Sequence, residues 1–427
     1  MPDITSEIIS DSISGKSGTE LYAEREQRVQ DAMDLKETDR VPLSLFSHFW
    51  PATLAGITFE QAMYDYDAFN DAMRQTLELL QPDMYALNQT YISVGPTLEL
   101  MEFKQLEWPG HGTDPNVSFQ FLDREYMKKN EYDDYLADPT NFFLRQYMPR
   151  VAGAFEPFAK LPYLPAQYYF KMIRVPTAFA DDDMIEGLEK ILAAGKEMRK
   201  MMKGALAFAK DMAEEGFVQS IGGSAAAPFD NFADYLRGSK GAMLDMFRNK
   251  DKLLECMDRV ADAIVKDTIV ASKHNPSRQI FIPLHWGLDN FMSPEQFELF
   301  FWPPLRKVLM GLIEADLIPC VLWEGDCTSR LETIADIPKG KAVYWFEQTD
   351  PVHAKEVLGD ITCIRGNVSS SMLITGTPDD VDAECKRLIK GAGKGGGFIL
   401  DGAIGLPDEA KVENVVAMAQ SVHKYAN

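Results

Sequence analysis

The sequence predicts one large (β/α)8 barrel, on the basis of three observations. Eight short and nearly all-apolar runs recur along the chain, each is followed by a helical pattern, and several end in charged or soft-ligand side chains. Parallel strands that are buried on both faces have this composition. A (β/α)8 barrel carries its chemistry at the carboxyl ends of such strands. An open doubly wound sheet is the alternative, although no Gly-x-Gly-x-x-Gly follows the first run.

The order of these elements follows the apolar pattern. The predicted strands are residues 41–46, 84–87, 217–221, 279–284, 318–323, 342–346, 361–364 and 397–400. The clearest predicted helices are residues 20–36, 58–80, 183–215, 241–273 and 413–425. Thr58 opens one of them with Gln61 three residues later, which is the spacing of a capping box. Ser293, Pro294 and Glu295 mark the start of another helix.

The chain reads as a single domain with a tail and an insertion. Residues 1–18 are polar and rich in Ser and Gly, which predicts a flexible tail ahead of a domain at 19–427. Residues 103–180 interrupt the strand–helix alternation with short strand-like pieces, acidic patches and many aromatic residues. We interpret this segment either as an insertion that covers the mouth of the barrel or as a helical packing layer.

Composition restricts the compartment and the partners. The chain has 427 residues and a formal net charge of -22, which disfavours nucleic acid and anionic membrane surfaces as partners. Five cysteines without a Cys-x-x-Cys pair predict a reducing compartment and no disulfide framework. No basic, apolar leader is seen, and no apolar run approaches the roughly 20 residues of a membrane span. We therefore expect a cytoplasmic protein with a small-molecule substrate, and both a monomer and a homo-oligomer remain open.

Polar residues at the predicted strand ends should meet at one mouth. They are His48, Asn88, Ser224, His285, Trp286, Glu324, Asp326, Cys327, Glu347, Asn367 and Asp401. A set of mixed nitrogen, sulfur and oxygen ligands suits zinc, with Glu324, Asp326, Cys327 and Asp401 as the candidate ligands. Alternatively, the carboxylates serve as general acid and base. Aromatic residues in the same region suit a planar apolar ligand: Trp50, Tyr91, Trp286 and Trp345.

Three segments resemble the uroporphyrinogen decarboxylase superfamily. They are Gly366-Asn-Val-Ser-Ser-Ser-Met-Leu-Ile-Thr-Gly-Thr-Pro-Asp-Asp-Val381, Gly397-Phe-Ile-Leu-Asp-Gly-Ala-Ile-Gly-Leu-Pro407 followed by Glu413-Asn-Val415, and Asp39-Arg-Val-Pro42. The resemblance runs in order over about residues 24–425 and is weakest at 103–180. It implies a (β/α)8 barrel. It also implies either decarboxylation of tetrapyrrole acetates without a cofactor or methyl transfer to or from a corrinoid protein, often with zinc.

The chain departs from both branches of that superfamily. Where the decarboxylases resemble one another in an Arg-rich segment, this chain has Ser47-His-Phe-Trp-Pro-Ala-Thr53, without an Arg to bind acetate groups. Asn88 stands at the place of the decarboxylase Asp. The thiol-activating methyltransferases have His-x-Cys and a later Cys, where this chain has Glu324-Gly-Asp326 (or Cys327) and Asp401. The resemblance thus implies an oxygen-rich site, better suited to a methyl ether than to a thiol.

These observations predict a methyltransferase that moves a methyl group between a small, methoxylated aromatic substrate and a separate corrinoid protein. No Asp-x-His-x-x-Gly occurs in the chain, so the corrinoid is expected on another protein. Glu324 and Asp401 are expected to bind a metal or protonate the leaving oxygen, His285 and His48 to orient the substrate, and Asn367 to hydrogen-bond it. Further substrate contacts are expected from Asn88, Trp286, Trp50 and Glu347. The alternatives are a carboxy-lyase acting on a less acidic substrate and a non-catalytic ligand-binding barrel.

Overall fold

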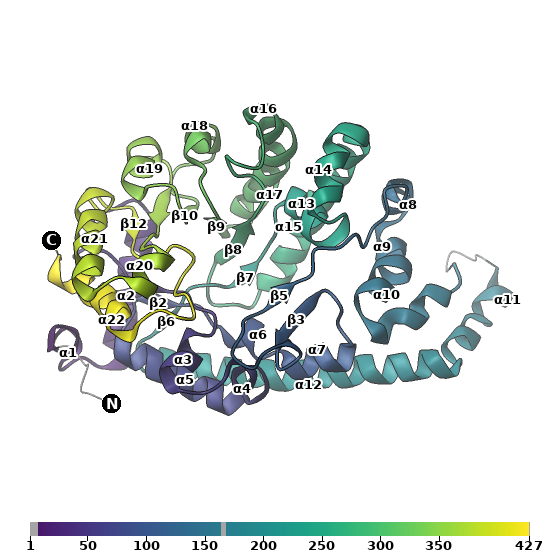
Figure 1. The fold of residues 1–427 in the computed structure, drawn as a ribbon, viewed down its shortest axis with the longest axis horizontal. Helices are drawn as coiled ribbons and strands as arrows, with labels where there is room; N and C mark the ends of the chain where they lie inside the picture. Colours follow the sequence, from purple (N-terminus) through teal and green to yellow (C-terminus); the bar gives the residue numbers. More distant parts are fainter. Residues whose placement is uncertain (1–6, 164–167, 427) are drawn as a thin grey trace.

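The computed structural model describes residues 7–163 and 168–426, which form a parallel β-barrel surrounded by helices (Figure 1). The strands occupy eight positions, as the sequence predicts. They are β1 (Ser44–Leu45), β2 (Met84–Tyr85), β6 (Val218–Gln219) with β7 (Gly223–Ser224), β8 (Gln279–Leu284), β9 (Ile318–Trp323), β10 (Val343–Phe346), β11 (Cys363–Arg365) and β12 (Phe398–Ile399). All neighbouring pairs among them are parallel.

The barrel closes at two places where the ladder is short. Leu43 and Leu400 form a parallel bridge between the first and last strands, and the Ser44 amide donates to the Leu400 carbonyl at 2.9 Å. At the third position the chain bends, so that β6 pairs with β2 and β7 pairs with β8. The predicted strand at 217–221 therefore continues into the small-residue stretch that follows it. This arrangement confirms the predicted fold class.

Helices connect successive strands and cover the outside of the barrel. The first part of the chain contains α1 (Glu7–Ile13), α2 (Gly18–Met33), α3 (Trp50–Ala55), α4 (Phe59–Tyr64), α5 (Tyr66–Leu80), α6 (Gln89–Ile92), α7 (Gly95–Met101) and α12 (Asp182–Glu214). The second part contains α13 (Pro228–Asp230), η4 (Asn231–Leu236), α14 (Ser239–Arg248), α15 (Lys250–Ser272), α16 (Pro294–Gln296), η5 (Phe297–Phe301), α17 (Trp302–Glu314), η6 (Thr328–Arg330), α18 (Leu331–Ile334), α19 (Pro351–Leu358), α20 (Ser370–Thr375), α21 (Pro378–Gly391) and α22 (Val412–Lys424).

Local capping explains where several of these helices begin. Thr58 and Gln61 form the predicted capping box at the start of α4, and Ser293 forms another with Gln296 at the start of α16. The single helix predicted for residues 58–80 is wrong, because Asp65 leaves the helical conformation between α4 and α5. Its carboxylate accepts the Ala68 amide at 3.0 Å and so caps the new helix.

The irregular segment contains a small sheet and a set of short helices. The sheet is β4–β3–β5, made from β3 (Leu106–Pro109), β4 (Gly112–Thr113) and β5 (Gln120–Phe121). The helices are α8 (Tyr132–Ala137), α9 (Pro139–Phe142), η1 (Phe143–Tyr147), α10 (Met148–Val151), η2 (Gly153–Lys160), α11 (Tyr169–Met172) and η3 (Val175–Phe179). Figure 1 shows α8–α11 beside the barrel, toward the far end of the long α12. η2 packs against α12, so this helical part forms a packing layer.

The chain ends differ from a simple tail plus domain. Within the predicted tail, residues Glu7–Ile13 form α1, which packs against α22 near the end of the chain. Residues 1–6 lie outside the described residues. Among the helices of residues 7–163 and 168–426, none combines the length and the apolar character needed to cross a membrane.

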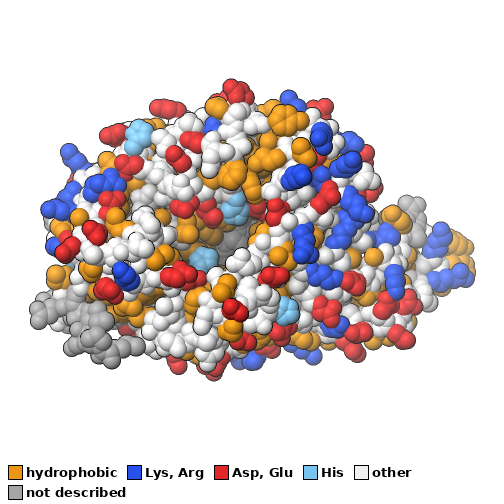
Figure 2. Space-filling model, in the orientation of Figure 1, with side chains coloured by type: hydrophobic (Ala, Val, Ile, Leu, Met, Phe, Trp, Pro, Cys, Tyr) orange, Lys and Arg blue, Asp and Glu red, His pale blue; other side chains and the backbone are white. Residues whose placement is uncertain are grey.

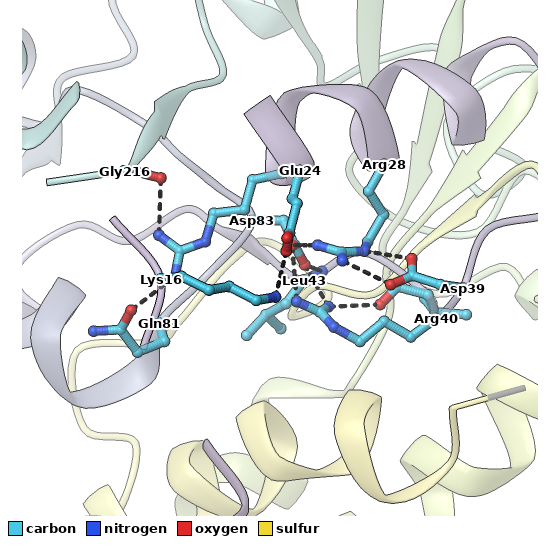
Figure 3. A network of polar contacts seen from close by, with 11 residues as sticks. Lys16, Glu24, Arg28, Asp39, Arg40, Leu43, Gln81, Asp83 and Gly216 are labelled. Carbon is cyan, nitrogen blue, oxygen red and sulfur yellow. Dashed lines mark hydrogen bonds and ion pairs between the residues drawn. The ribbon is translucent and has the colours of Figure 1, made fainter. Parts of the chain in front are cut away.

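A closed ion-pair network lies at the amino ends of the first two strands (Figure 3). The Asp83 carboxylate, whose side chain is 0% exposed, accepts Arg28 at 2.6 Å and Arg40 at 2.6 and 2.9 Å. It also accepts the Leu43 amide at 2.8 Å. Burial raises the pKa of Asp83, but the two guanidinium groups and the amide outweigh burial and lower it. The network therefore ties α2 to the starts of β1 and β2.

Candidate active site

Two of the predicted residues meet where neighbouring strands end. β8 and β9 pair in register through Leu284 and Trp323, and the next residues are His285 and Glu324. The His285 Nε2 atom lies 3.7 Å from Glu324 Oε1. Their side chains are 33% and 35% exposed, so both groups reach solvent at the carboxyl end of the barrel. Figure 2 shows a hollow at the centre of this face, with histidine and acidic side chains around it.

A second carboxylate binds the other side of the imidazole. Asp234 Oδ2 lies 2.7 Å from His285 Nδ1, and its Oδ1 accepts the Trp286 indole N–H at 2.6 Å. Asp234 therefore fixes the orientation of both rings that follow β8. We call Asp234–His285–Glu324 the carboxylate–imidazole chain. It has a closed end at Asp234 and an open end at Glu324.

Asp230 binds the backbone of the loop that follows β8. Its Oδ2 accepts the His285 amide at 2.9 Å, whereas its buried Oδ1 has no hydrogen-bond partner among the described residues. Burial raises the pKa of Asp230 to about 8; the Asp234 charge adds to this, and the His285 charge opposes it. At neutral pH Asp230 is therefore mostly a neutral acid.

The electrostatics of the chain keep His285 protonated. Burial would lower its pKa, but the hydrogen bond to Asp234, the Glu324 carboxylate 3.7 Å away and the charge of Asp230 once it is ionised outweigh burial and raise that pKa to about 11. At neutral pH both ring nitrogens carry hydrogen. Nδ1–H donates to Asp234, so the Nε2–H toward Glu324 is the proton that a bound molecule can reach.

Sequence reasoning missed Asp230 and Asp234. Both lie in the turn α13–η4 that follows β7, four residues apart and therefore on one face of the helical turn. The available signal was an acidic pair with this spacing, Asp230-Asn-Phe-Ala-Asp234, directly after a strand end. Helical periodicity alone does not show that this face turns toward the barrel.

Two further predicted residues, His48 and Glu347, lie near the carboxylate–imidazole chain. Burial lowers the pKa of His48, opposed by the Glu324 charge, so the His48 imidazole is neutral. Burial and then the Glu324 charge raise the pKa of Glu347. Glu347 follows β10, which pairs with β9 through Phe346 and Trp323, so it lies next to Glu324 on the neighbouring strand, whereas His48 follows β1.

Aromatic rings form a floor beneath these groups. Phe46 contacts Tyr91, Phe281 and Trp345 with ring centroids 6.0, 5.2 and 5.3 Å apart. The His48 ring lies 5.6 Å from the Phe46 ring, edge to face. Phe46 and Trp345 are buried, whereas Tyr91 and Phe281 are partly exposed. This aromatic floor, Phe46, Tyr91, Phe281 and Trp345, gives the hollow an apolar base below a polar rim.

The other predicted substrate contacts have internal partners. The Asn88 amide donates to Ser47 Oγ at 2.5 Å, and its Oδ1 is buried without a partner among the described residues. The Asn367 amide donates to the carbonyls of Glu347 and Thr349 at 3.1 and 3.0 Å, which braces the turn after β10. The prediction that Trp50 lines the mouth is wrong. Trp50 is 0% exposed and donates to the Ala410 carbonyl at 2.9 Å.

Asp401 does not share the cavity of His285 and Glu324, and that expectation is wrong. Its side chain and that of Arg365 are both 0% exposed, and they pair at 2.6 Å. The Arg365 guanidinium also lies 3.9 Å from the Trp345 ring centre. A buried carboxylate with this partner stabilises the barrel interior and cannot protonate a leaving group in the hollow.

The four predicted zinc ligands do not fit a metal site. Asp326 turns toward Thr328, accepting its amide at 2.9 Å and its hydroxyl at 2.5 Å. The Cys327 thiol is buried against the Thr349 hydroxyl, and burial raises its pKa. With Asp401 paired inside the barrel, only Glu324 of the four faces the hollow. No group of three or more His, Cys, Asp or Glu able to hold a metal ion exists among residues 7–163 and 168–426.

The chain folds as a (β/α)8 barrel, and the carboxylate–imidazole chain lies at the carboxyl ends of its strands. The family model for uroporphyrinogen decarboxylase (URO-D) matches residues 175–425, more than half of the chain. The chain therefore belongs to the uroporphyrinogen decarboxylase family. The matched region includes β6 to α22 and the whole carboxylate–imidazole chain.

Individual relatives are distant. The uroporphyrinogen decarboxylase of Pseudoalteromonas atlantica is 24% identical over 184 residues, 42% of this chain and 50% of that protein. The uroporphyrinogen decarboxylase of Pseudomonas fluorescens strain Pf-5 is 26% identical over 192 residues, 44% of this chain and 52% of that protein. The chain thus spans about half the length of the curated relatives it matches.

A solved structure covers nearly the whole chain. A methyltransferase from Methanosarcina mazei superposes with a TM-score of 0.58, covering 94% of this chain and 98% of that one at 16% identity. At this identity the likeness shows that the two proteins share a fold.

Proposed function

We propose that this protein is a methyltransferase that moves a methyl group between a small methoxylated aromatic substrate and a corrinoid carried by a separate protein. The observation that carries the proposal is an imidazole held between two carboxylates at the edge of an aromatic-floored hollow. His285 Nε2 is held toward the hollow by Asp234 on the far side of the ring. An aryl ring on the floor would bring its ether oxygen within reach of this proton.

The charge of the site supports an uncharged aryl ether over a tetrapyrrole acetate. The groups near His285 are the carboxyl groups of Asp230, Asp234, Glu324 and Glu347. Arg365, which lies beside the aromatic floor, already forms an ion pair with Asp401. A substrate bearing many carboxylates would meet repulsion here without matching cations.

The residues supply proton chemistry for cleavage of the ether. A reduced corrinoid on the partner would supply the nucleophile for the methyl group. The electron pair of the broken carbon–oxygen bond stays on the aryl oxygen, and His285 Nε2 gives that oxygen its proton. Phenols have pKa values near 10 and His285 has a pKa of about 11, so the two sites are closely matched.

Glu324 influences the pKa of the His285 imidazolium. Its carboxylate, 3.7 Å from Nε2, helps to raise the pKa of His285 in the empty site. A substrate oxygen placed between the two groups would weaken that contact and make the imidazolium a stronger acid. In the reverse direction, the neutral imidazole would accept the phenol proton.

A product assay tests the proposal. Purified protein is mixed with free cob(I)alamin and 1,2-dimethoxybenzene, and methylcobalamin is followed by absorbance and the phenol by chromatography. We expect both products in equal amounts, with His285→Gln reducing the rate about 100-fold or more. His353→Gln, at an exposed histidine on α19 that pairs with Glu356, is the matched control and should retain activity.

The rival is a carboxy-lyase acting on a less acidic substrate, because the curated relatives are decarboxylases. One carboxylate could pair with the His285 imidazolium. Release of carbon dioxide in step with substrate loss, without any corrinoid, would favour that reaction. Binding of aryl ethers without turnover in wild type and variants alike would favour a ligand-binding barrel.

A further inference from the structure

A groove with exposed positive charge lies beside the candidate site. Its volume is about 670 Å³, and it is formed by the loop before α8 and by α14. We call it the basic groove. Four of its lining residues are exposed cations: Arg124, Lys129, Lys240 and Arg248. None of the four side chains makes an ion pair or hydrogen bond within residues 7–163 and 168–426.

The carboxylates of the basic groove do not neutralise these cations. Asp245 accepts the Arg237 guanidinium at 2.6 Å, and Glu125 pairs with the same arginine. Asp123 accepts the Ser239 amide at 2.9 Å. Asp123 keeps its charge, and Asp245 and Glu125 share one arginine, but the five cations of the lining outnumber its three carboxylates, so the groove has a net positive charge. This is unusual on a chain whose formal net charge is -22.

α14 adds exposed apolar side chains to the same surface. Leu244 is 36% exposed and Phe247 is 76% exposed. With Lys240 and Arg248 they follow an i, i+4, i+7, i+8 spacing, so all four lie on one face of the helix. Aromatic, aliphatic and cationic side chains together are typical of protein interfaces, whereas a site for a free small anion needs no exposed phenylalanine.

The basic groove and the candidate site share one segment of chain. η4 carries Asp234 of the carboxylate–imidazole chain, and Arg237 of the groove follows η4 directly. Tyr235, between them, is 39% exposed. Figure 2 shows Lys and Arg side chains gathered to the right of the central hollow, on the side where Figure 1 places α14. A partner seated here would reach the hollow.

We propose that the basic groove docks an acidic face of the protein that carries the methyl acceptor. This inference rests on the proposed methyl transfer and adds where the partner binds and which charge it presents. Docking beside η4 would place the partner's corrinoid over the open end of the carboxylate–imidazole chain. Opposite charges would speed the encounter of two proteins that diffuse to each other, an effect that salt weakens.

A comparison of two acceptors tests the inference. The double variant Lys240→Glu/Arg248→Glu and the control Lys339→Glu/Lys394→Glu each reverse two exposed lysine or arginine charges. The control positions lie in loops that precede β10 and β12, at the other end of the barrel. Methyl transfer is measured with free cob(I)alamin and with recombinant corrinoid protein, chosen as the one that the wild-type protein methylates fastest.

We expect the groove variant to lose about tenfold or more in kcat/KM toward the corrinoid protein and to retain its rate with free cob(I)alamin. Raising the salt should slow wild type with the protein acceptor more than it slows the groove variant. The control variant should match wild type with both acceptors.

Three results would overturn the inference. Equal rates of the groove variant and wild type toward the corrinoid protein would show that docking occurs elsewhere. Methylation of free cob(I)alamin but of no corrinoid protein would show that no protein acceptor docks on this chain. Binding of inorganic phosphate that the groove variant loses, with transfer unchanged, would make the groove a small-anion site. Failure of the proposed function itself is distinct, because it would abolish transfer to free cob(I)alamin in every variant.

Discussion

The two ends of the barrel use the same types of side chain in opposite ways. At the amino end, Asp83 is fully buried and accepts two arginines and a backbone amide (Figure 3). At the carboxyl end, His285 has one tight carboxylate partner and faces Glu324 across 3.7 Å with a third of each side chain exposed. The closed network is suited to stability. The open one leaves a proton and space for a ligand.

The largest expected effect comes from breaking the closed network. Asp83→Ala leaves Arg40 with an unpaired buried charge and Arg28 with only the exposed Asp39 as its ion-pair partner, so the free energy of unfolding should fall by about 3–5 kcal/mol. Urea denaturation measures this loss. The methyl-transfer rate per folded molecule should remain close to wild type, because the network lies away from the hollow. A loss of activity without a loss of stability would contradict the division between the two ends.

The next largest effect is expected at Asp234, the closed end of the carboxylate–imidazole chain. Asp234→Asn removes the charge that holds His285 protonated and oriented, so kcat should fall about 100-fold while stability changes less. Steady-state kinetics and urea denaturation separate the two quantities. Asp336→Asn, at an exposed carboxylate that pairs with Arg306, is the matched control. If kcat in Asp234→Asn stayed within threefold of wild type, His285 would not depend on this contact.

These contrasts also show what the sequence could predict. Eight apolar runs predicted the barrel, since strands buried on both faces need continuous apolar side chains. Parallel neighbours end at one edge, so His285 and Glu324 were predicted together correctly. Asp401 was placed wrongly because its partner Arg365 comes from the neighbouring strand β11, and strand order alone does not show which polar side chains pair inside.

The helical turn after β7 was harder to predict. Asp234 acts on His285 over a separation of 51 residues, and no local pattern encodes that contact. The dispersal of the four candidate zinc ligands has a similar cause. Asp326 and Cys327 follow Glu324 closely in sequence, but the turn directs them to Thr328 and Thr349 instead of the hollow.

Asp230, which binds the His285 amide, should make the free energy of unfolding depend on pH. Its pKa is about 8 in the folded protein against an ordinary 3.8, so folding favours the protonated acid. This preference makes wild-type stability fall as pH rises from about 4 to 8. Asp230→Asn mimics the neutral acid, so its stability relative to wild type should increase over that window. Urea denaturation at pH 5, 6.5 and 8 checks the trend, and a constant difference would contradict it.

The smallest expected effect lies at the exposed edge of the closed network. Asp39 binds Arg28 at 2.7 Å but its side chain is 67% exposed. Asp39→Asn should therefore cost less than about 1 kcal/mol, because water already solvates the pair. Thermal or urea denaturation beside Asp83→Ala measures the contrast. Equal losses in the two variants would show that burial does not set the strength of this network.

The most direct test of the account is the protonation state of His285 in the folded protein. Proton–nitrogen NMR of ¹⁵N-histidine-labelled protein, with His285→Gln for assignment, follows its ring nitrogens from pH 5 to 10. We expect a His285 imidazolium that persists through pH 9, and a His48 ring that is already neutral at pH 7. A His285 ring that loses its proton near pH 6.5 would contradict its role as the proton donor.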